Sequence, residues 1–142
     1  MEPETLTGDW VIQKGGWSPH YARVRLIVQD NDVAMAFVDG NGDGAEYEIE
    51  AWSREEAGWQ EHASSGGPGG GIVGSALKVG AIWCVAGIAA PGSIVHIRWQ
   101  GTSYECRANQ HGFWGWVRRV EDLNERPAII DAKRPSNGSG VS

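Results

Sequence analysis

The chain has 142 residues, of which 41% are hydrophobic and 21 are glycines, and its formal net charge is −6. This length suits one folded domain with its own core. The acidic balance argues against nucleic-acid binding, which depends on a basic surface. The first ten residues are acidic and lack a signal-peptide core, and no apolar run approaches the roughly 20 residues of a membrane helix. We therefore expect a cytoplasmic protein that binds neither nucleic acids nor membranes.

Charge is divided unevenly along the chain. Residues 1–71 carry four basic and thirteen acidic side chains, a net of −9, whereas residues 72–142 carry eight basic and five acidic ones, a net of +3. Such asymmetry is one indication of association with a partner. A homo-oligomer could form through these opposite charges or through an exposed edge strand. The simpler interpretation of the acidic half is that its carboxylates lie on solvated strand faces.

Short segments with alternating apolar and polar residues, separated by turns rich in Gly, Asn and Asp, run through the first half of the chain. This pattern is typical of antiparallel strands. Residues 10–13 are a candidate edge strand. In residues 45–52 the apolar positions alternate with Glu46, Glu48 and Glu50, whose carboxylates we expect to face water. The strands expected in this half are residues 22–29, 33–38, 45–52 and 59–64.

A glycine-rich stretch at residues 65–75 separates the two halves and has the composition of a flexible joint. The second half repeats the alternation of the first. A further strand is expected at residues 128–131, before a polar tail at residues 132–142 that we expect to be flexible. The other strands expected in this half are residues 82–89, 93–100, 103–108 and 113–120.

The sequence thus predicts an all-β fold with a single domain over residues 1–131. Two meanders, at residues 21–64 and 81–120, would each form an antiparallel sheet. Because a sheet of four strands cannot bury both of its faces alone, we expect one meander to pack on the other. The predicted architecture is an antiparallel β-sandwich or flattened barrel of about eight strands.

Residues 39–50, DGNGDGAEYEIE, match the EF-hand calcium loop, with Asp39, Asn41, Asp43 and Glu50 at ligand positions. An EF-hand loop joins two helices, whereas the flanking segments here have the alternation of strands. Asn-Gly and Asp-Gly also supply the positive φ that a tight hairpin needs. We favour the hairpin interpretation and expect no tight calcium site.

No nucleophile elbow, phosphate-binding lysine loop or His-Glu-x-x-His motif occurs in the sequence. Cys84, His96, Cys106 and His111 include the residue types of a zinc site but lack its paired short spacings. We therefore expect no cofactor and no metal, with the two cysteines as reduced, buried thiols. A small enzyme whose catalytic groups converge only in the folded chain is an alternative.

Eight tryptophans are more than one small core readily buries. In the strand expected at residues 113–120, Trp114, Trp116 and Arg118 fall on one face. If that face is exposed, basic residues of neighbouring strands extend it into an aromatic and cationic surface for a ligand or partner. In the reverse orientation, both tryptophans belong to the core. The residues of the candidate surface are Trp114, Trp116, Arg118, Arg98, His96 and Arg107.

These observations favour a non-catalytic binding or interaction module, with a protein partner or a small ligand. The alternatives are a small-ligand or carbohydrate-binding module, a calcium-stabilised module and a small pocket enzyme. Exposed tryptophans on a flat face would favour binding. A deep pocket holding a histidine or carboxylate with a shifted pKa would favour an enzyme.

Overall fold

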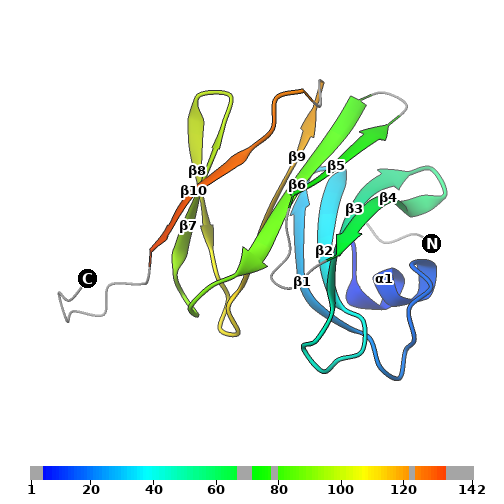
Figure 1. Cartoon of the computed structure of the whole chain (residues 1–142). Coiled ribbons are helices and arrows are strands. Elements are labelled where there is room, and N and C mark those ends of the chain that lie inside the picture. The colour runs from blue at the N-terminus through cyan, green and yellow to red at the C-terminus, as the bar shows by residue number, and fades with distance from the viewer. Residues whose placement is uncertain (1–4, 67–71, 78–79, 122–123, 134–142) are drawn as a thin grey trace.

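The computed structural model describes residues 5–66, 72–77, 80–121 and 124–133, which contain ten strands and one short helix (Figure 1). The prediction of an all-β fold is confirmed, and every recorded strand pairing is antiparallel. The described strands form three open sheets rather than a closed barrel. We name them sheets A, B and C.

Sheet A is a meander in which neighbouring strands are also consecutive in the chain. The four strands expected in the first half are confirmed, with ends that differ by three residues or fewer. Asn31, with a φ of +57°, makes the tight turn between the first two strands. The strands of sheet A are β1 (Arg23–Asp30), β2 (Val33–Asp39), β3 (Tyr47–Glu55) and β4 (Gly58–Gly66).

The second half does not form the expected meander. Its strands belong to two sheets, and β6 pairs with β9 although two other strands lie between them in the chain. Those two strands, β7 and β8, form a hairpin that packs over sheet B, and β10 pairs with β7. Sheet B contains β5 (Ile72–Leu77), β6 (Gly80–Ile88) and β9 (Phe113–Val120). Sheet C contains β10 (Ala128–Lys133), β7 (Ile94–Trp99) and β8 (Thr102–Arg107).

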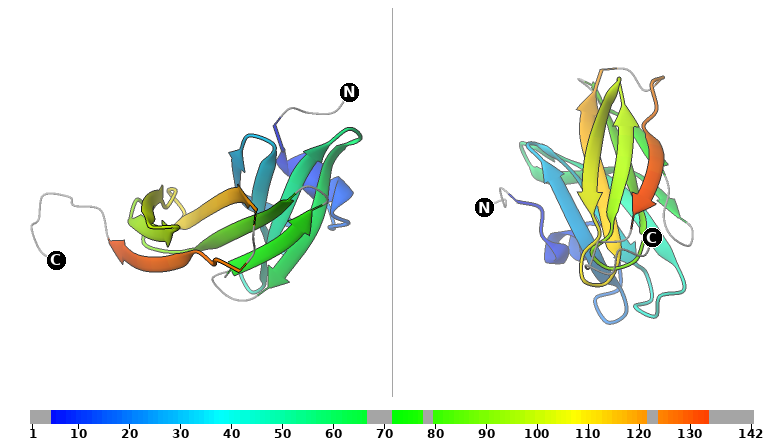
Figure 2. Two further views of the ribbon diagram at one scale, coloured as in Figure 1. Left: turned by 90° about the horizontal axis from the view of Figure 1, so that it is seen from above. Right: turned by 90° about the vertical axis from the view of Figure 1, so that its left-hand side faces the viewer.

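Sheet B lies between sheets A and C, and the helix covers the far face of sheet A (Figures 1 and 2). Alternate residues of β6 enter two different cores. Ile82 and Cys84 pack toward sheet A, whereas Trp83 and Val85 pack toward sheet C. A strand that is buried on both faces must be apolar on both, which explains why β6 has no polar alternation.

Gly115 in β9 allows sheets A and B to approach closely. A Cβ atom at this position would overlap the Met35 sulfur of β2 and would lie 3.3 Å from Val28 Cγ2 of β1. The large Met35 side chain therefore occupies the space above the glycine. This close packing leaves Trp114 and Trp116, the neighbours of Gly115, on the opposite face of β9, toward sheet C.

Residues 10–13, expected as an edge strand, lie instead in α1 (Gly8–Lys14). The Thr7 side chain caps this helix by accepting a hydrogen bond from the Trp10 backbone N–H. The Trp10 indole then donates to the Trp59 carbonyl at 3.0 Å, which ties the helix to β4. With seven residues, this helix of the described chain is too short to cross a membrane.

The joint expected at residues 65–75 is partly strand, because β4 extends to Gly66 and β5 begins at Ile72. Residues 67–71 lie outside the described part of the chain. The return strand expected at residues 128–131 is confirmed and extends to Lys133 as β10. Most of the predicted flexible tail, residues 134–142, also lies outside the described part.

Candidate functional site

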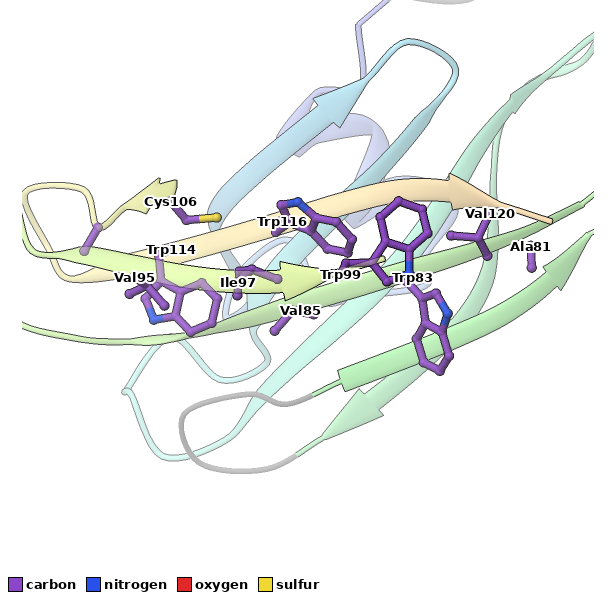
Figure 3. Packing of buried hydrophobic residues seen from close by; sticks show 11 residues of the cluster. Ala81, Trp83, Val85, Val95, Ile97, Trp99, Cys106, Trp114, Trp116 and Val120 are labelled. Atoms are coloured by element: carbon purple, nitrogen blue, oxygen red, sulfur yellow. The ribbon is translucent and has the colours of Figure 1, made fainter. Parts of the chain in front are cut away.

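Trp114 and Trp116 do not form an exposed face. Their side chains are 4% and 2% exposed and pack in the core between sheets B and C (Figure 3). The β7–β8 hairpin covers this side of β9, and Val95 and Ile97 of β7 contact the same cluster. The sequence placed the two indoles on one face and left two orientations open. The structure has the buried orientation, so Trp114 and Trp116 are not part of an exposed candidate surface.

Arg118 contacts a tryptophan of the candidate surface. Its guanidinium carbon lies 5.0 Å from the centroid of the Tyr104 ring and 5.2 Å from that of Trp116. Its Nε atom is 3.9 Å from the Asp30 carboxylate. The guanidinium thus packs against the aromatic core and faces a carboxylate of sheet A.

The remaining three residues of the candidate surface lie on the outer face of sheet C. His96 Nε2 is 3.3 Å from the Glu105 carboxylate, and Arg107 donates a hydrogen bond to the Gly92 carbonyl at 3.1 Å. Arg98 is exposed. Inward-facing residues of β7 separate all three from Arg118, so the structure does not bring the six residues together.

Asp39 organises the loop between β2 and β3, where the sequence resembles a calcium loop. Its buried carboxylate accepts hydrogen bonds from the N–H groups of Gly42 and Gly44, at 3.0 and 2.9 Å, and from Arg25 at 3.0 Å. Burial opposes the ionisation of Asp39, but the Arg25 hydrogen bond and the loop amides outweigh it and lower its pKa. Asp43 accepts from the Ala45 N–H at 3.0 Å. These are the local hydrogen bonds of a turn.

Glu50, the last residue of that loop motif, does not face water as the alternation predicted. It is 1% exposed, because α1 and the segment after it cover this face of sheet A. Its two carboxyl oxygens accept hydrogen bonds from the indole N–H groups of Trp17, at 3.0 Å, and Trp52, at 3.1 Å. Within the described residues, no three His, Cys, Asp or Glu side chains are grouped as metal ligands.

Glu50 also shares a hydrogen bond with Glu61 of β4. Burial, followed by the negative charge of Glu61, raises the pKa of Glu50 to about 8. Burial likewise raises the pKa of Glu61. Two contacting carboxyl groups hold one proton between them near neutral pH, because like charges oppose full ionisation. We call Glu50 and Glu61 the carboxyl pair. The two catalytic carboxylates of a glycosidase lie on either side of the scissile bond of the substrate. The carboxyl groups of this pair contact each other, so no substrate fits between them.

An open depression of about 350 Å³ lies beside the carboxyl pair. Trp17 forms part of its wall, and none of the described residues that line it is a lysine or arginine. The side-chain carboxylates of Glu46 and Glu48, which also line it, form no hydrogen bond or ion pair within the described residues. We call this site the acidic depression. Its lining residues are Trp17, Gly40, Ala45, Glu46, Tyr47, Glu48 and Gly66.

A serine, a histidine and a carboxylate meet near the turn between β3 and β4. The buried Ser53 Oγ contacts the Glu55 carboxylate and lies 2.6 Å from His62 Nε2. Burial lowers the pKa of His62. In a catalytic triad the carboxylate orients the other ring nitrogen of the histidine, and the serine is accessible to substrate. Here the carboxylate binds the serine instead, and Ser53 is fully buried.

Trp17 and Glu61 are the residues of this region that the sequence did not single out. Glu61 lies opposite Trp52 in the β3–β4 pairing, which places it diagonally across from Glu50 on the same face. The sequence matches no known protein family, and no curated protein or solved structure matches it either. The geometry of the acidic depression and of the carboxyl pair behind it is therefore the basis on which a function is assigned.

Proposed function

We propose that the chain is a non-catalytic binding module of the β-sandwich type and that the acidic depression binds a cationic group of its ligand. The observation that supports this proposal is the pair of glutamates, Glu46 and Glu48, that line the depression beside the Trp17 ring and have no basic partner in the described part of the chain. A lysine or arginine side chain of a partner protein and a small organic cation both supply the required charge.

Two physical effects favour a cation at this position. An aromatic face attracts a cation by about 0.5–1 kcal/mol at an exposed site, and Trp17 offers such a ring. Each exposed carboxylate adds a further contribution of roughly 0.2–1 kcal/mol. The excess of acidic residues in the first half of the chain also raises the local concentration of cationic ligands. Binding of moderate affinity and marked salt dependence is expected.

The proposal is tested with N-acetyl-triarginine amide as the probe, because guanidinium groups stay charged at every accessible pH. The indole N–H resonance of Trp17, assigned with Trp17→Phe, reports binding in a two-dimensional NMR titration. We predict a saturable shift for the natural chain. The double variant Glu46→Gln, Glu48→Gln should bind roughly tenfold more weakly, as expected for the loss of about 1.4 kcal/mol.

Glu56→Gln is the matched control, because it removes the same kind of charge from the exposed turn at the other end of β3. It should bind the probe as the natural chain does. Equal weakening in this control would indicate attraction by net charge alone and would contradict a defined site. A saccharide that shifts the Trp17 resonance equally in the natural chain and the double variant would favour the carbohydrate-binding alternative.

We also propose that the module acts in the cytoplasm. Cys84 and Cys106 are both free and buried, and unpaired thiols suit a reducing compartment. Burial raises the pKa of Cys106 to about 11, and it raises that of Cys84 as well. Both thiols therefore stay protonated and unreactive at neutral pH.

A further inference from the structure

Trp17 belongs to the acidic depression and to the carboxyl pair at the same time. Its ring lines the depression, and its indole N–H donates to Glu50 Oε2 at 3.0 Å. A second connection runs through Glu48, which also lines the depression and acts electrostatically on Glu61. Two residues thus connect the depression to the carboxyl pair: Trp17, which donates to Glu50, and Glu48, whose charge acts on Glu61.

The charged groups that act on the pair are acidic. The negative charge of Glu61, in β4, acts on Glu50. The negative charge of Glu48, in β3, acts on Glu61. From the helix side, the neutral indole of Trp17 contacts Glu50. Asp9 and Lys14 of α1 form no hydrogen bond or ion pair with either carboxyl group in the part of the chain that the structure describes. Within the residues that the structure describes, no cation therefore offsets a second negative charge on the pair.

We propose that a cationic group bound in the acidic depression is linked to release of the proton that Glu50 and Glu61 share, so that ligand affinity rises with pH. This inference rests on the proposed function, because it concerns regulation of the same site. A cation near Glu48 supplies the positive charge that the pair lacks, and this favours the doubly ionised pair. By thermodynamic reciprocity, loss of the proton must then favour the cation to the same extent.

The chemistry of the step is a simple ionisation. Glu50 loses its proton to solvent, and the two indole N–H groups that already face its oxygens remain as donors to the resulting carboxylate. Burial of the acid moves this ionisation toward the slightly alkaline range. An ordinary exposed glutamate would be fully ionised there and would exchange no proton on binding.

The experiment is isothermal calorimetry with N-acetyl-triarginine amide, at about pH 6.5 and about pH 9. The charge of the probe is constant over this range. We expect affinity to rise about fivefold for the natural chain, the lower end of typical coupling between sites. Titrations in phosphate and in Tris, which differ in ionisation enthalpy, should show a proton released to the buffer on binding near the middle of the range.

Glu50→Gln and Glu61→Gln each remove the shared proton, and both should bind the probe with little change between the two pH values. Glu61 is the more exposed of the two, so Glu61→Gln tests the linkage even if Glu50→Gln folds poorly. Glu56→Gln should keep the pH dependence of the natural chain. Other groups that titrate in this range are present in every variant, so their contribution to the pH dependence of binding cancels when the variants are compared.

Three adverse outcomes are distinguishable. Binding of equal strength at both pH values, with no proton released, overturns the linkage but leaves the proposed function intact. Absence of binding at either pH overturns the proposed function and the linkage with it. A pH dependence that persists unchanged in both Glu50→Gln and Glu61→Gln also overturns the inference, because the proton then comes from another group.

Discussion

At the scale of single residues, Glu50 is under opposing influences. Burial and the neighbouring Glu61 favour its protonated form, whereas the indole N–H groups of Trp17 and Trp52 favour the carboxylate. Burial and the charge of Glu61 outweigh the two indole hydrogen bonds, and the pKa of Glu50 rises from 4.5 to about 8. Between these two values the folded protein holds a proton that the unfolded chain has lost, so stability in this range must fall as pH rises.

We predict that Glu50→Gln flattens this dependence. The stabilising effect of the protonated acid is complete below about pH 4.5 and lost as pH passes about 8, whereas glutamine is neutral throughout. Thermal unfolding should show the melting temperature of the natural chain falling by several degrees between about pH 6 and pH 9, relative to the variant. Glu56→Gln serves as the control and should follow the natural chain. Parallel curves for all three proteins would contradict the buried acid.

Gly115 offers a second residue-scale test. A Cβ at this position would overlap the Met35 sulfur, so Gly115→Ala should cost roughly 1–3 kcal/mol of unfolding free energy, as overpacking does. Urea denaturation measures this loss. Gly8→Ala is the control, because its Cβ would lie at an ordinary 3.6 Å from Val24 and should change stability by less than about 0.5 kcal/mol. Equal losses in both variants would show that the sheets do not approach at Gly115.

At the scale of elements, the positions of strands were predictable and their partners were less so. Alternation located β1 to β4 and β9 because it is a local signal. It also assigned Glu50 to the correct face of β3, but it could not show that α1 covers that face. The helix itself was missed because residues 10–13 are too few to establish a period, and the Thr7 cap was the available signal.

The pairing of β9 with β6 carried its own sequence signal. Phe113 and Val117 face one way and Trp114 and Trp116 the other, so both faces of β9 are apolar. An apolar pattern on both faces is typical of a central strand, not of the last strand in a meander. The candidate surface on this strand required one of its faces to be exposed, whereas both faces are covered. The acidic depression had no comparable signal, since Trp17 reaches it from outside the sheet.

Trp116→Ala tests the burial of this element directly. The indole is 2% exposed, and its ring centroid lies 5.5 Å from that of Trp99 and 5.6 Å from that of Tyr104. We predict a loss of roughly 3–5 kcal/mol in unfolding free energy, the usual result of truncating a buried tryptophan. Tyr21→Ala is the control, since Tyr21 is 64% exposed, and should cost less than about 0.5 kcal/mol. A small loss at Trp116 would restore the exposed surface.

At the scale of the whole molecule, the uneven distribution of charge has an internal use. Arg119 of β9 forms an ion pair with Asp32 of the first half at 3.1 Å, and Arg118 faces Asp30 at 3.9 Å. Two of the basic residues of the second half are thus directed at acids of the first. The asymmetry that indicated association with a partner therefore serves in part to align sheet B on sheet A. Among the described residues, none of these basic side chains lines the acidic depression.

The position of sheet B between two cores also has a consequence during synthesis of the chain. The four strands of sheet A leave the ribosome first and find all their pairing partners within that sheet. Met35 and Phe37 on the inner face of the sheet are not yet covered at that stage. β6 follows, and its pairing partner β9 appears only after the β7–β8 hairpin. The nascent protein therefore presents an aromatic, β-rich face until nearly the last strand is made. Chaperone capture of the nascent chain should be greatest in this interval.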